Sequence, residues 1–186
     1  MKKKICIFGG SVSGKDKANE DLANLVGKTI AESNFNIVFG AGEKGMMGSV
    51  ASSSIASGAN TTGIIPKFFL NEDNINTIFP NKFNTKLIIT KTMHERKQLM
   101  YNKSDAFLIL PGGIGTLDEF FEVLTWCQLN LIKNKNIGIL NFSGYWDPLI
   151  SLIKGIISEG FMSSNNLLYF EEIKNVELLK KFLNNI

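Results

Sequence analysis

The sequence predicts an α/β protein with a doubly wound, mainly parallel sheet and helices on both of its faces. Short apolar runs alternate with segments of helical periodicity along the chain, which is the pattern of strand–helix–strand units. Several apolar runs are followed directly by glycines, as happens where a strand of such a sheet turns into the next helix. We therefore expect a Rossmann-like architecture.

The first elements follow from apolar runs and their boundaries. Lys4–Phe8 is a short apolar run that ends at two glycines, which predicts a buried strand. Ala18–Asn34 carries Leu22, Val26 and other apolar residues at helical spacing, which predicts an amphipathic helix. Asn36–Phe39 is again short and apolar, and it predicts the second strand.

The next elements are punctuated by small residues and proline. Met46–Ser57 is rich in small side chains, which predicts a helix packed closely on the sheet. Thr62–Ile65 predicts a third strand that stops at Pro66, because proline has no N–H to donate to a neighbouring strand. Residues 67–84 have no clear period, so we expect a loop or flap there.

The second half of the chain repeats the alternation. Strands are expected at Lys86–Thr90, Ala106–Leu110 and Ile137–Phe142, with an edge strand at Leu167–Phe170. Helices are expected at Met93–Lys103, Thr116–Leu131, Trp146–Ser158 and Val176–Leu183. No internal repeat or linker interrupts this order, so residues 1–186 are expected to form a single nucleotide-binding α/β domain.

Composition and charge indicate an ordinary globular protein, with 44% hydrophobic and 20% charged residues and a net charge of +3. Three of the positive charges stand together at Lys2, Lys3 and Lys4, so the rest of the chain does not predict a nucleic-acid-binding surface. No stretch approaches the roughly 20 apolar residues that span a bilayer. We expect no nucleic-acid or membrane partner.

The two cysteines indicate a reducing compartment. Cys6 and Cys127 both lie within apolar stretches, which favours buried free thiols over a disulfide or a metal pair. The apolar run that follows the basic start is too short for a secretory signal and ends in two glycines. A cytoplasmic protein is expected.

Three glycine-rich segments are expected at one edge of the sheet: Gly9–Gly14, Gly40–Gly48 and Pro111–Gly115. In open α/β sheets, ligands bind beyond the carboxyl ends of the strands, where these segments fall. Turn geometry alone would account for one or two of them. Three on the same edge favour a shared phosphate or nucleotide site.

The sharpest segment is Pro111–Glu119, which follows an expected strand and opens an expected helix. Glycines let the backbone approach a ligand closely. A helix N-terminus adds free N–H groups and a partial positive charge, and together these features form a typical phosphate site. The plain alternative is a tight strand-to-helix turn.

Two carboxylates lie in this segment. Thr116 and Glu119 have the Thr-x-x-Glu spacing of a capping box, which competes with a catalytic role for Glu119. The capping role and the catalytic role need not exclude each other, because Asp118 and Glu119 are adjacent on the helix and point in different directions. We expect such a carboxylate to stay ionised beside the helix N-terminus, and to face a sugar rather than a phosphate.

Arg96 is the second candidate for chemistry. Met93, Leu99 and Met100 are its neighbours on a helix surface, so its guanidinium projects from a mostly apolar face. A buried guanidinium needs an anionic partner, and the glycine segment with Glu119 is the expected supplier. The alternative is an arginine whose tip reaches water.

The other polar residues of this segment have plainer interpretations. Thr92 and Glu95 also have capping-box spacing, so Glu95 is expected to be structural. His94, the only histidine, is expected at the helix start or on the surface rather than as a general base. Lys97 lies nearer the polar side and can assist Arg96. No cluster has metal-ligand spacing, so no metal is expected.

One segment imitates a P-loop. Gly9–Asp16 reads G-x-x-x-x-G-K followed by Asp, one residue away from the nucleotide-binding motif. The position that would hold a Mg²⁺-binding hydroxyl carries the Asp16 carboxylate instead. A nucleoside triphosphatase is therefore disfavoured.

Pro111–Glu119, preceded by Met93–Lys97, resembles the Lonely Guy (LOG) family of cytokinin riboside 5′-monophosphate phosphoribohydrolases, long labelled lysine decarboxylases. The likeness covers nearly the whole chain. Further matching segments are Phe8–Ser11, Gly40–Gly42, Gly45–Gly48, Thr125–Leu129 and Gly144–Leu149. This sequence departs from the family at Asp118, where a glutamate is usual, and at Ala41, where a glycine is usual.

The resemblance implies roles for particular residues. Arg96 and Glu119 would be the catalytic pair. Substrate contacts would come from Lys97, Gly112, Gly113, Ile114, Gly115, Thr116, Leu117, Asp118, Thr125, Gly10, Ser11 and Gly42, with Glu72 as a further acid. The resemblance also implies a homodimer whose site is completed across the subunit interface, and it requires no cofactor and no metal.

We therefore expect a hydrolase that cleaves the N-glycosidic bond of a purine nucleoside 5′-monophosphate, of the cytokinin type or adenosine, to free base and ribose 5-phosphate. The phosphate would dock on the backbone of Gly112–Thr116, and Glu119 would stabilise positive charge on the sugar or activate water. The alternative from another class is a non-catalytic nucleotide- or cofactor-binding module. Lysine decarboxylation would need a lysine that binds pyridoxal phosphate, and is disfavoured.

Overall fold

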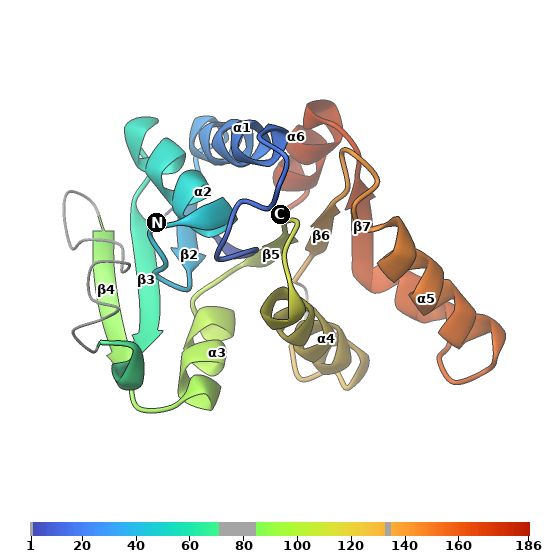
Figure 1. Cartoon of the computed structure of the whole chain (residues 1–186). Coiled ribbons are helices and arrows are strands. Elements are labelled where there is room, and N and C mark those ends of the chain that lie inside the picture. The colour runs from blue at the N-terminus through green and yellow to red at the C-terminus, as the bar shows by residue number, and fades with distance from the viewer. Residues whose placement is uncertain (1, 71–84, 133–134) are drawn as a thin grey trace.

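The computed structural model describes residues 2–70, 85–132 and 135–186. Its seven-stranded sheet has the order β4-β3-β2-β1-β5-β6-β7, and every neighbouring pair is parallel (Figure 1). The strands are β1 (Lys4–Phe8), β2 (Asn36–Phe39), β3 (Thr61–Pro66), β4 (Thr85–Thr90), β5 (Ala106–Ile109), β6 (Ile137–Leu140) and β7 (Phe170–Ile173). The predicted doubly wound α/β fold is confirmed.

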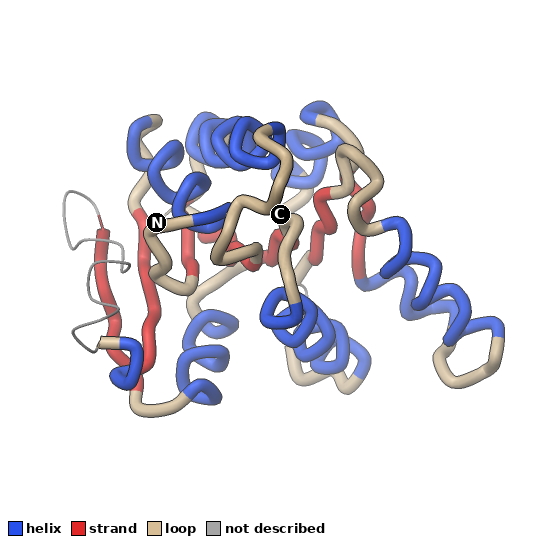
Figure 2. Tube along the Cα trace, viewed as in Figure 1, coloured by secondary structure: helices blue, strands red, loops and turns tan. Residues whose placement is uncertain are grey.

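Helices cover both faces of this sheet (Figures 1 and 2). They are α1 (Ala18–Glu32), α2 (Gly45–Ala56), α3 (Met93–Asn102), α4 (Ile114–Gln128), α5 (Asp147–Ser158) and α6 (Val176–Asn184), with short 3-10 helices η1 (Lys67–Phe69) and η3 (Ser164–Tyr169). In Figure 1, α1, α2 and α6 lie above the sheet, and α3, α4 and α5 lie below it. Among the described residues, no helix combines the length and apolarity that a membrane span needs.

Each face of the sheet carries its own apolar core. One contains Ile5, Ile7 and residues of α1, α2 and α6, and the other contains Cys6, Phe8 and residues of α3, α4 and α5. The alternation follows from β1, because successive strand residues point to opposite faces. The prediction of buried free thiols is confirmed for both cysteines, and burial raises the pKa of Cys6.

The small residues of α2 serve a close contact between helices. A side chain at Gly27 of α1 would begin only 2.4 Å from the Val50 carbonyl oxygen of α2. The Ser54 hydroxyl donates a hydrogen bond of 2.8 Å to the Gly27 carbonyl. The predicted close packing is therefore mainly against α1 rather than against the sheet.

The strand order sets where a ligand can bind. β1 pairs with β2 on one side and with β5 on the other, so the direction of winding reverses at β1. In open α/β sheets this reversal opens a crevice beyond the carboxyl ends of the strands. The loops after β1 and β5 meet there, because the Gly10 N–H donates a hydrogen bond of 3.0 Å to the Pro111 carbonyl.

Several element boundaries differ from the prediction. The edge strand expected at Leu167–Phe170 is wrong, because the strand runs from Phe170 to Ile173 and Leu167 and Tyr169 pack against the core from η3. Helix α4 starts at Ile114, two residues before the predicted start. Glu72 and most of the expected loop at 67–84 lie outside the described residues.

Candidate functional site

The N-terminus of α4 presents an open array of backbone amides. Gly113 is the N-cap residue, and its carbonyl accepts hydrogen bonds from the N–H groups of Thr116 and Leu117, at 3.0 and 3.1 Å. The first N–H groups of a helix have no partner within it. Gly113, Ile114 and Gly115 are all exposed, so their amides are available to an anion.

The three glycines of this segment have different surroundings. A side chain at Gly112 would meet the Thr116 hydroxyl at 2.2 Å and the Gly10 nitrogen at 2.7 Å. Side chains at Gly113 and Gly115 would meet nothing within 4 Å. Packing therefore requires glycine at position 112, whereas the other two leave open space beside the amides.

Other segments contact this loop and the neighbouring loop after β1. The Tyr145 hydroxyl donates a hydrogen bond of 2.7 Å to the Gly112 carbonyl. Gly45, in the left-handed region with φ of 70°, packs its α-carbon against the backbone of Ser11 and Val12. The expected meeting of glycine segments at one edge is confirmed. Sequence reasoning assigned no role to Tyr145, although the residue lies in the family-matching segment Gly144–Leu149.

Two cavities adjoin the amide array. A pocket of about 230 Å³ is lined by Gly10, Val12, Ser13, Gly14, Asn19, Met46, Pro111, Gly112, Gly113 and Tyr145. A more apolar groove of about 540 Å³ is lined by Gly112, Gly113, Ile114, Leu117, Phe121, Tyr145, Trp146, Pro148, Leu149 and Leu152. The array is therefore accessible to a ligand from both sides of the loop.

Arg96 and Glu119 form a buried ion pair. Arg96 Nη1 lies 3.3 Å from Glu119 Oε1, and the two side chains are only 11% and 9% exposed. Arg96 Nε also donates a hydrogen bond of 3.1 Å to the Ile64 carbonyl. The predicted pairing is confirmed, and the alternative of an arginine tip in water is wrong.

A glycine far away in the chain makes room for this pair. A Cβ atom at Gly40 would lie 1.9 Å from Arg96 Nη2. The glycine after β2 therefore lets the guanidinium pass over the backbone toward α4. The pattern of residues around Arg96 on its own helix carries no sign of this contact, because the contact joins positions 40 and 96 of the chain.

Of the two capping-box patterns in the sequence, one forms a helix cap in the structure and the other does not. The capping box that Thr116 and Glu119 offered as an alternative does not form, because the N-cap is Gly113 and Glu119 pairs with an arginine instead. The cap at Thr92 is confirmed, since its hydroxyl accepts a hydrogen bond of 3.1 Å from the Glu95 N–H. His94 is exposed in the first turn of α3, as expected.

Burial sets the protonation of Glu119. Desolvation raises the pKa of its carboxyl from 4.5 to about 7, and this effect outweighs the nearby Arg96 guanidinium, which lowers it. Burial therefore outweighs the expected stabilisation of the ionised form by the helix N-terminus. A carboxyl group that exchanges its proton near pH 7 is suited to acid–base work.

Lys97 is also buried, and it is held by carboxylates of α4. Its Nζ lies 2.8 Å from Glu122 Oε2 and 3.1 Å from Asp118 Oδ2. Burial lowers the pKa of the ammonium, but hydrogen bonds to Glu122 and Asp118 outweigh it, so the pKa lies above its ordinary value. The buried Tyr101 hydroxyl donates a hydrogen bond to Glu122. Sequence reasoning missed Glu122 and Tyr101.

The remaining predicted residues lie in the loops after β1 and β2 and along α4. Ser11 is exposed in the loop after β1, and Gly42 lies in the loop after β2 near Met47. Leu117 lines the apolar groove. Thr125 is exposed two turns along α4 from Asp118, on the same side of the helix. Their substrate contacts stay predictions.

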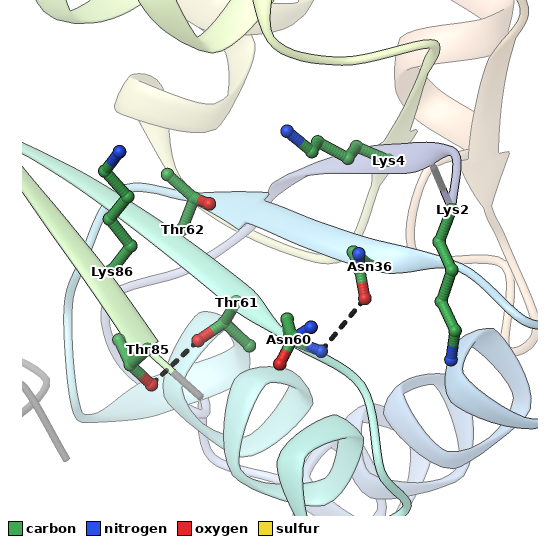
Figure 3. Close-up of a pocket in the computed structure, with 8 residues that line it drawn as sticks. All are labelled: Lys2, Lys4, Asn36, Asn60, Thr61, Thr62, Thr85 and Lys86. Atoms are coloured by element: carbon green, nitrogen blue, oxygen red, sulfur yellow. Dashed lines mark hydrogen bonds between the residues drawn. The ribbon is translucent and has the colours of Figure 1, made fainter. Parts of the chain in front are cut away.

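A third pocket lies at the opposite edge of the sheet (Figure 3). It has a volume of about 600 Å³ and is lined by Lys2, Lys4, Asn36, Asn60, Thr61, Thr62, Thr85 and Lys86. These residues stand at the amino ends of β1 to β4, so the pocket is separate from the amide array. Within the described ranges, no group of three His, Cys, Asp or Glu side chains is placed to hold a metal ion.

Comparison with known proteins gives one family. Residues 47–182 match the family model described as possible lysine decarboxylase. The chain is 38% identical over 164 residues to the probable cytokinin riboside 5′-monophosphate phosphoribohydrolase LOGL2 of Oryza sativa subsp. japonica, covering 86% of this chain and 63% of that protein. It is 38% identical over 164 residues to the cytokinin riboside 5′-monophosphate phosphoribohydrolase of Rhodococcoides fascians, covering 87% and 79%.

The solved structures support the fold. The molybdenum cofactor binding protein from the phototrophic bacterium Rippkaea orientalis superposes with a TM-score of 0.70 at 18% identity. The match covers 99% of this chain and 96% of that one. At this identity the likeness concerns the arrangement of strands and helices alone. The chain spans less than two thirds of the rice protein's length.

Proposed function

The chain belongs to the LOG family, whose model is described as possible lysine decarboxylase, and on that premise we propose that it hydrolyses the N-glycosidic bond of a purine nucleoside 5′-monophosphate. The products are the free base and ribose 5-phosphate. The observation that carries the proposal is the buried Arg96–Glu119 pair at 3.3 Å, whose carboxylate lies on the helix that also presents the exposed amide array.

The amide array supports a phosphate clamp. Exposed N–H groups at the start of α4 offer several donors to one phosphate, and the helix dipole favours its negative charge. Glu119 follows Ile114 by five positions, which is roughly 7 Å along a helix axis. A phosphate held at the array would therefore place the ribose, rather than the phosphate, near the carboxylate.

Gly113→Ala is expected to weaken substrate binding without unfolding the loop. A methyl group at position 113 meets no protein atom within 4 Å, but it projects into the space beside the amides. We expect KM for a nucleoside monophosphate to rise about tenfold and the melting temperature to stay unchanged. Gly112→Ala is the matched variant, and it should lower the melting temperature because its methyl group clashes with Thr116. An unchanged KM for Gly113→Ala would contradict the clamp.

Glu119 supplies the electrostatics of bond cleavage. As the bond between C1′ and the base breaks, positive charge develops on the sugar, and an adjacent carboxylate stabilises it. The same carboxylate can accept a proton from the attacking water. The water oxygen bonds to C1′, the base departs with the electrons of the broken bond, and the proton taken up by Glu119 passes to the base. Arg96 holds the carboxylate in place and favours its ionised form.

The pH dependence follows from Glu119 and has opposite signs for activity and stability. Hydrolysis needs the ionised carboxylate, so kcat/KM should rise with pH and level off above about 7. Between 4.5 and about 7 the folded chain binds one more proton than the unfolded chain, so this group's contribution to stability falls as pH rises. Rate and denaturant profiles across this range test both signs, and a flat rate profile would contradict the role of Glu119.

We further propose a homodimer in which a second copy covers the apolar groove. Ile114 and Leu152 of this groove are 81% and 55% exposed, which leaves a contiguous apolar surface beside the amide array. Such surfaces on soluble proteins commonly mark interfaces. A partner seated there would complete the site next to the glycine segment. Light scattering measures the oligomeric state directly.

The direct test of activity is the release of base. We would incubate the protein with AMP and with N6-isopentenyladenosine 5′-monophosphate, separate the products by chromatography, and assay for adenine, N6-isopentenyladenine and ribose 5-phosphate. Equal amounts of base and ribose 5-phosphate support the proposal, and the ratio of the two rates gives the preferred base. Tight binding of both nucleotides without any release would favour a non-catalytic nucleotide-binding module.

A further inference from the structure

Helices α3 and α4 are joined by a ladder of four polar side chains that the proposed chemistry does not use. Lys97 and Tyr101 stand one turn apart on α3, and Asp118 and Glu122 stand one turn apart on α4. Glu122 contacts both residues of α3, because its Oε2 accepts from the Tyr101 hydroxyl and lies 2.8 Å from Lys97 Nζ. Asp118 contacts Lys97 alone, at 3.1 Å.

The two carboxylates differ in exposure. The side chain of Glu122 is 22% exposed and that of Asp118 is 56% exposed, while that of Lys97 is 10% exposed. Ion pairs in water-rich surroundings contribute little, whereas a buried ammonium needs a close partner. Glu122 is therefore the anchor of the Lys97 ammonium, and Asp118 is the partner that can leave it.

We propose that Glu122 is a positioning residue that fixes the Lys97 ammonium beside the start of α4, so that the ammonium stays in place when the more exposed Asp118 turns away from it. The proposal rests on the proposed function for the identity of the substrate. Tyr101 helps to hold Glu122 in place, because it is fully buried and its hydroxyl donates a hydrogen bond to the same Glu122 oxygen that faces Lys97. Glu122 acts on the substrate only through Lys97.

The position of Lys97 also matters for the neighbouring catalytic pair. The charges that act on Glu119 are those of Arg96 and Lys97 on α3 and those of Asp118 and Glu122 on α4. Lys97 favours the ionised form of Glu119, and the two other carboxylates of α4 oppose it. By holding Lys97, Glu122 keeps the positive charge of this ammonium close to the carboxylates of Asp118, Glu119 and Glu122 itself.

Glu122→Gln tests the proposal, because glutamine keeps the size of the side chain and can still accept from Tyr101 but carries no charge. We expect KM for the nucleoside monophosphate to rise about tenfold while kcat changes less than about threefold. Lys97→Met should show the same loss, and the double variant should lose no more than Lys97→Met alone, because both changes remove one interaction. Glu171→Gln, an exposed glutamate of β7, is the control and should change nothing.

A second readout does not depend on activity. The pKa of the Lys97 ammonium, followed by ¹⁵N NMR of Nζ, should fall in Glu122→Gln because burial remains while the largest favourable partner is lost. An unchanged Lys97 titration, or additive losses in the double variant, would overturn the proposal. If wild-type protein releases no base, the proposed function fails, and the Lys97 titration still decides whether Glu122 holds the ammonium.

Discussion

Glu119→Gln is expected to lower base release by about 10³-fold while nucleotide binding is retained. The substitution keeps the shape of the side chain and removes the charge that would stabilise the sugar cation. The phosphate clamp is built from backbone amides at Gly113–Gly115, which the change does not touch. The loss should therefore appear in kcat, with little change in the dissociation constant of AMP.

Single-turnover rates and calorimetric AMP binding separate these two effects. Glu171→Gln serves again as the control for removal of a glutamate charge, because that residue is exposed on the edge strand β7. The assignment of Glu119 as the catalytic carboxylate is wrong if Glu119→Gln releases base at the wild-type rate.

Arg96→Met has the second largest expected effect. It leaves the Glu119 carboxyl buried without the guanidinium that lowers its pKa, so the neutral form persists to higher pH. We expect activity at pH 7 to fall by about 100-fold and to recover in part as the pH is raised. The same change should destabilise the fold most at alkaline pH, where Glu119 must ionise without a partner.

The measurement is a pH–rate profile together with chemical denaturation at two pH values. Lys28→Met is the control, because Lys28 forms an exposed pair with Glu32 on α1, and such pairs contribute little. If the activity of Arg96→Met falls at the same acidic pH as that of the wild type, the claim that the guanidinium controls the pKa of Glu119 is wrong.

The sequence was sufficient for the centre of the site because its signals are local. Arg96 stands among apolar neighbours on its own helix, which demands an anionic partner, and the glycine segment that supplies Glu119 follows an apolar strand. The pairing at 3.3 Å and the exposed amides of α4 follow from these two patterns. The parallel sheet could also be predicted from the sequence, because its strands are short apolar runs between helices.

The failures share a different cause, which is tertiary packing. The capping-box spacing at Thr116 cannot reveal that Gly113 already begins the helix. The raised pKa of Glu119 arises from burial, which depends on where Arg96 and its neighbours lie in space. The contacts of Glu122 and Tyr101 depend on which faces of α3 and α4 meet, and periodicity within one helix does not specify the face of its neighbour.

The edge strand was misplaced for a related reason. Leu167 and Tyr169 form an apolar run that looks like a strand, but they pack against the core from the 3-10 helix η3. The strand that follows contains Glu171 and Glu172 between Phe170 and Ile173. Because β7 lies at the edge of the sheet, where charged side chains are common, its two glutamates hid it from a search for apolar runs.

The measurement that tests the central claim most directly compares AMP with adenosine as substrates of the wild-type protein. If the amides of α4 hold the 5′-phosphate and so place C1′ beside Glu119, kcat/KM for adenine release should be at least about 100-fold greater for AMP, because the binding of a remote group is used to position the reacting bond. Equal rates of adenine release from the two compounds would contradict the clamp and the mechanism built on it.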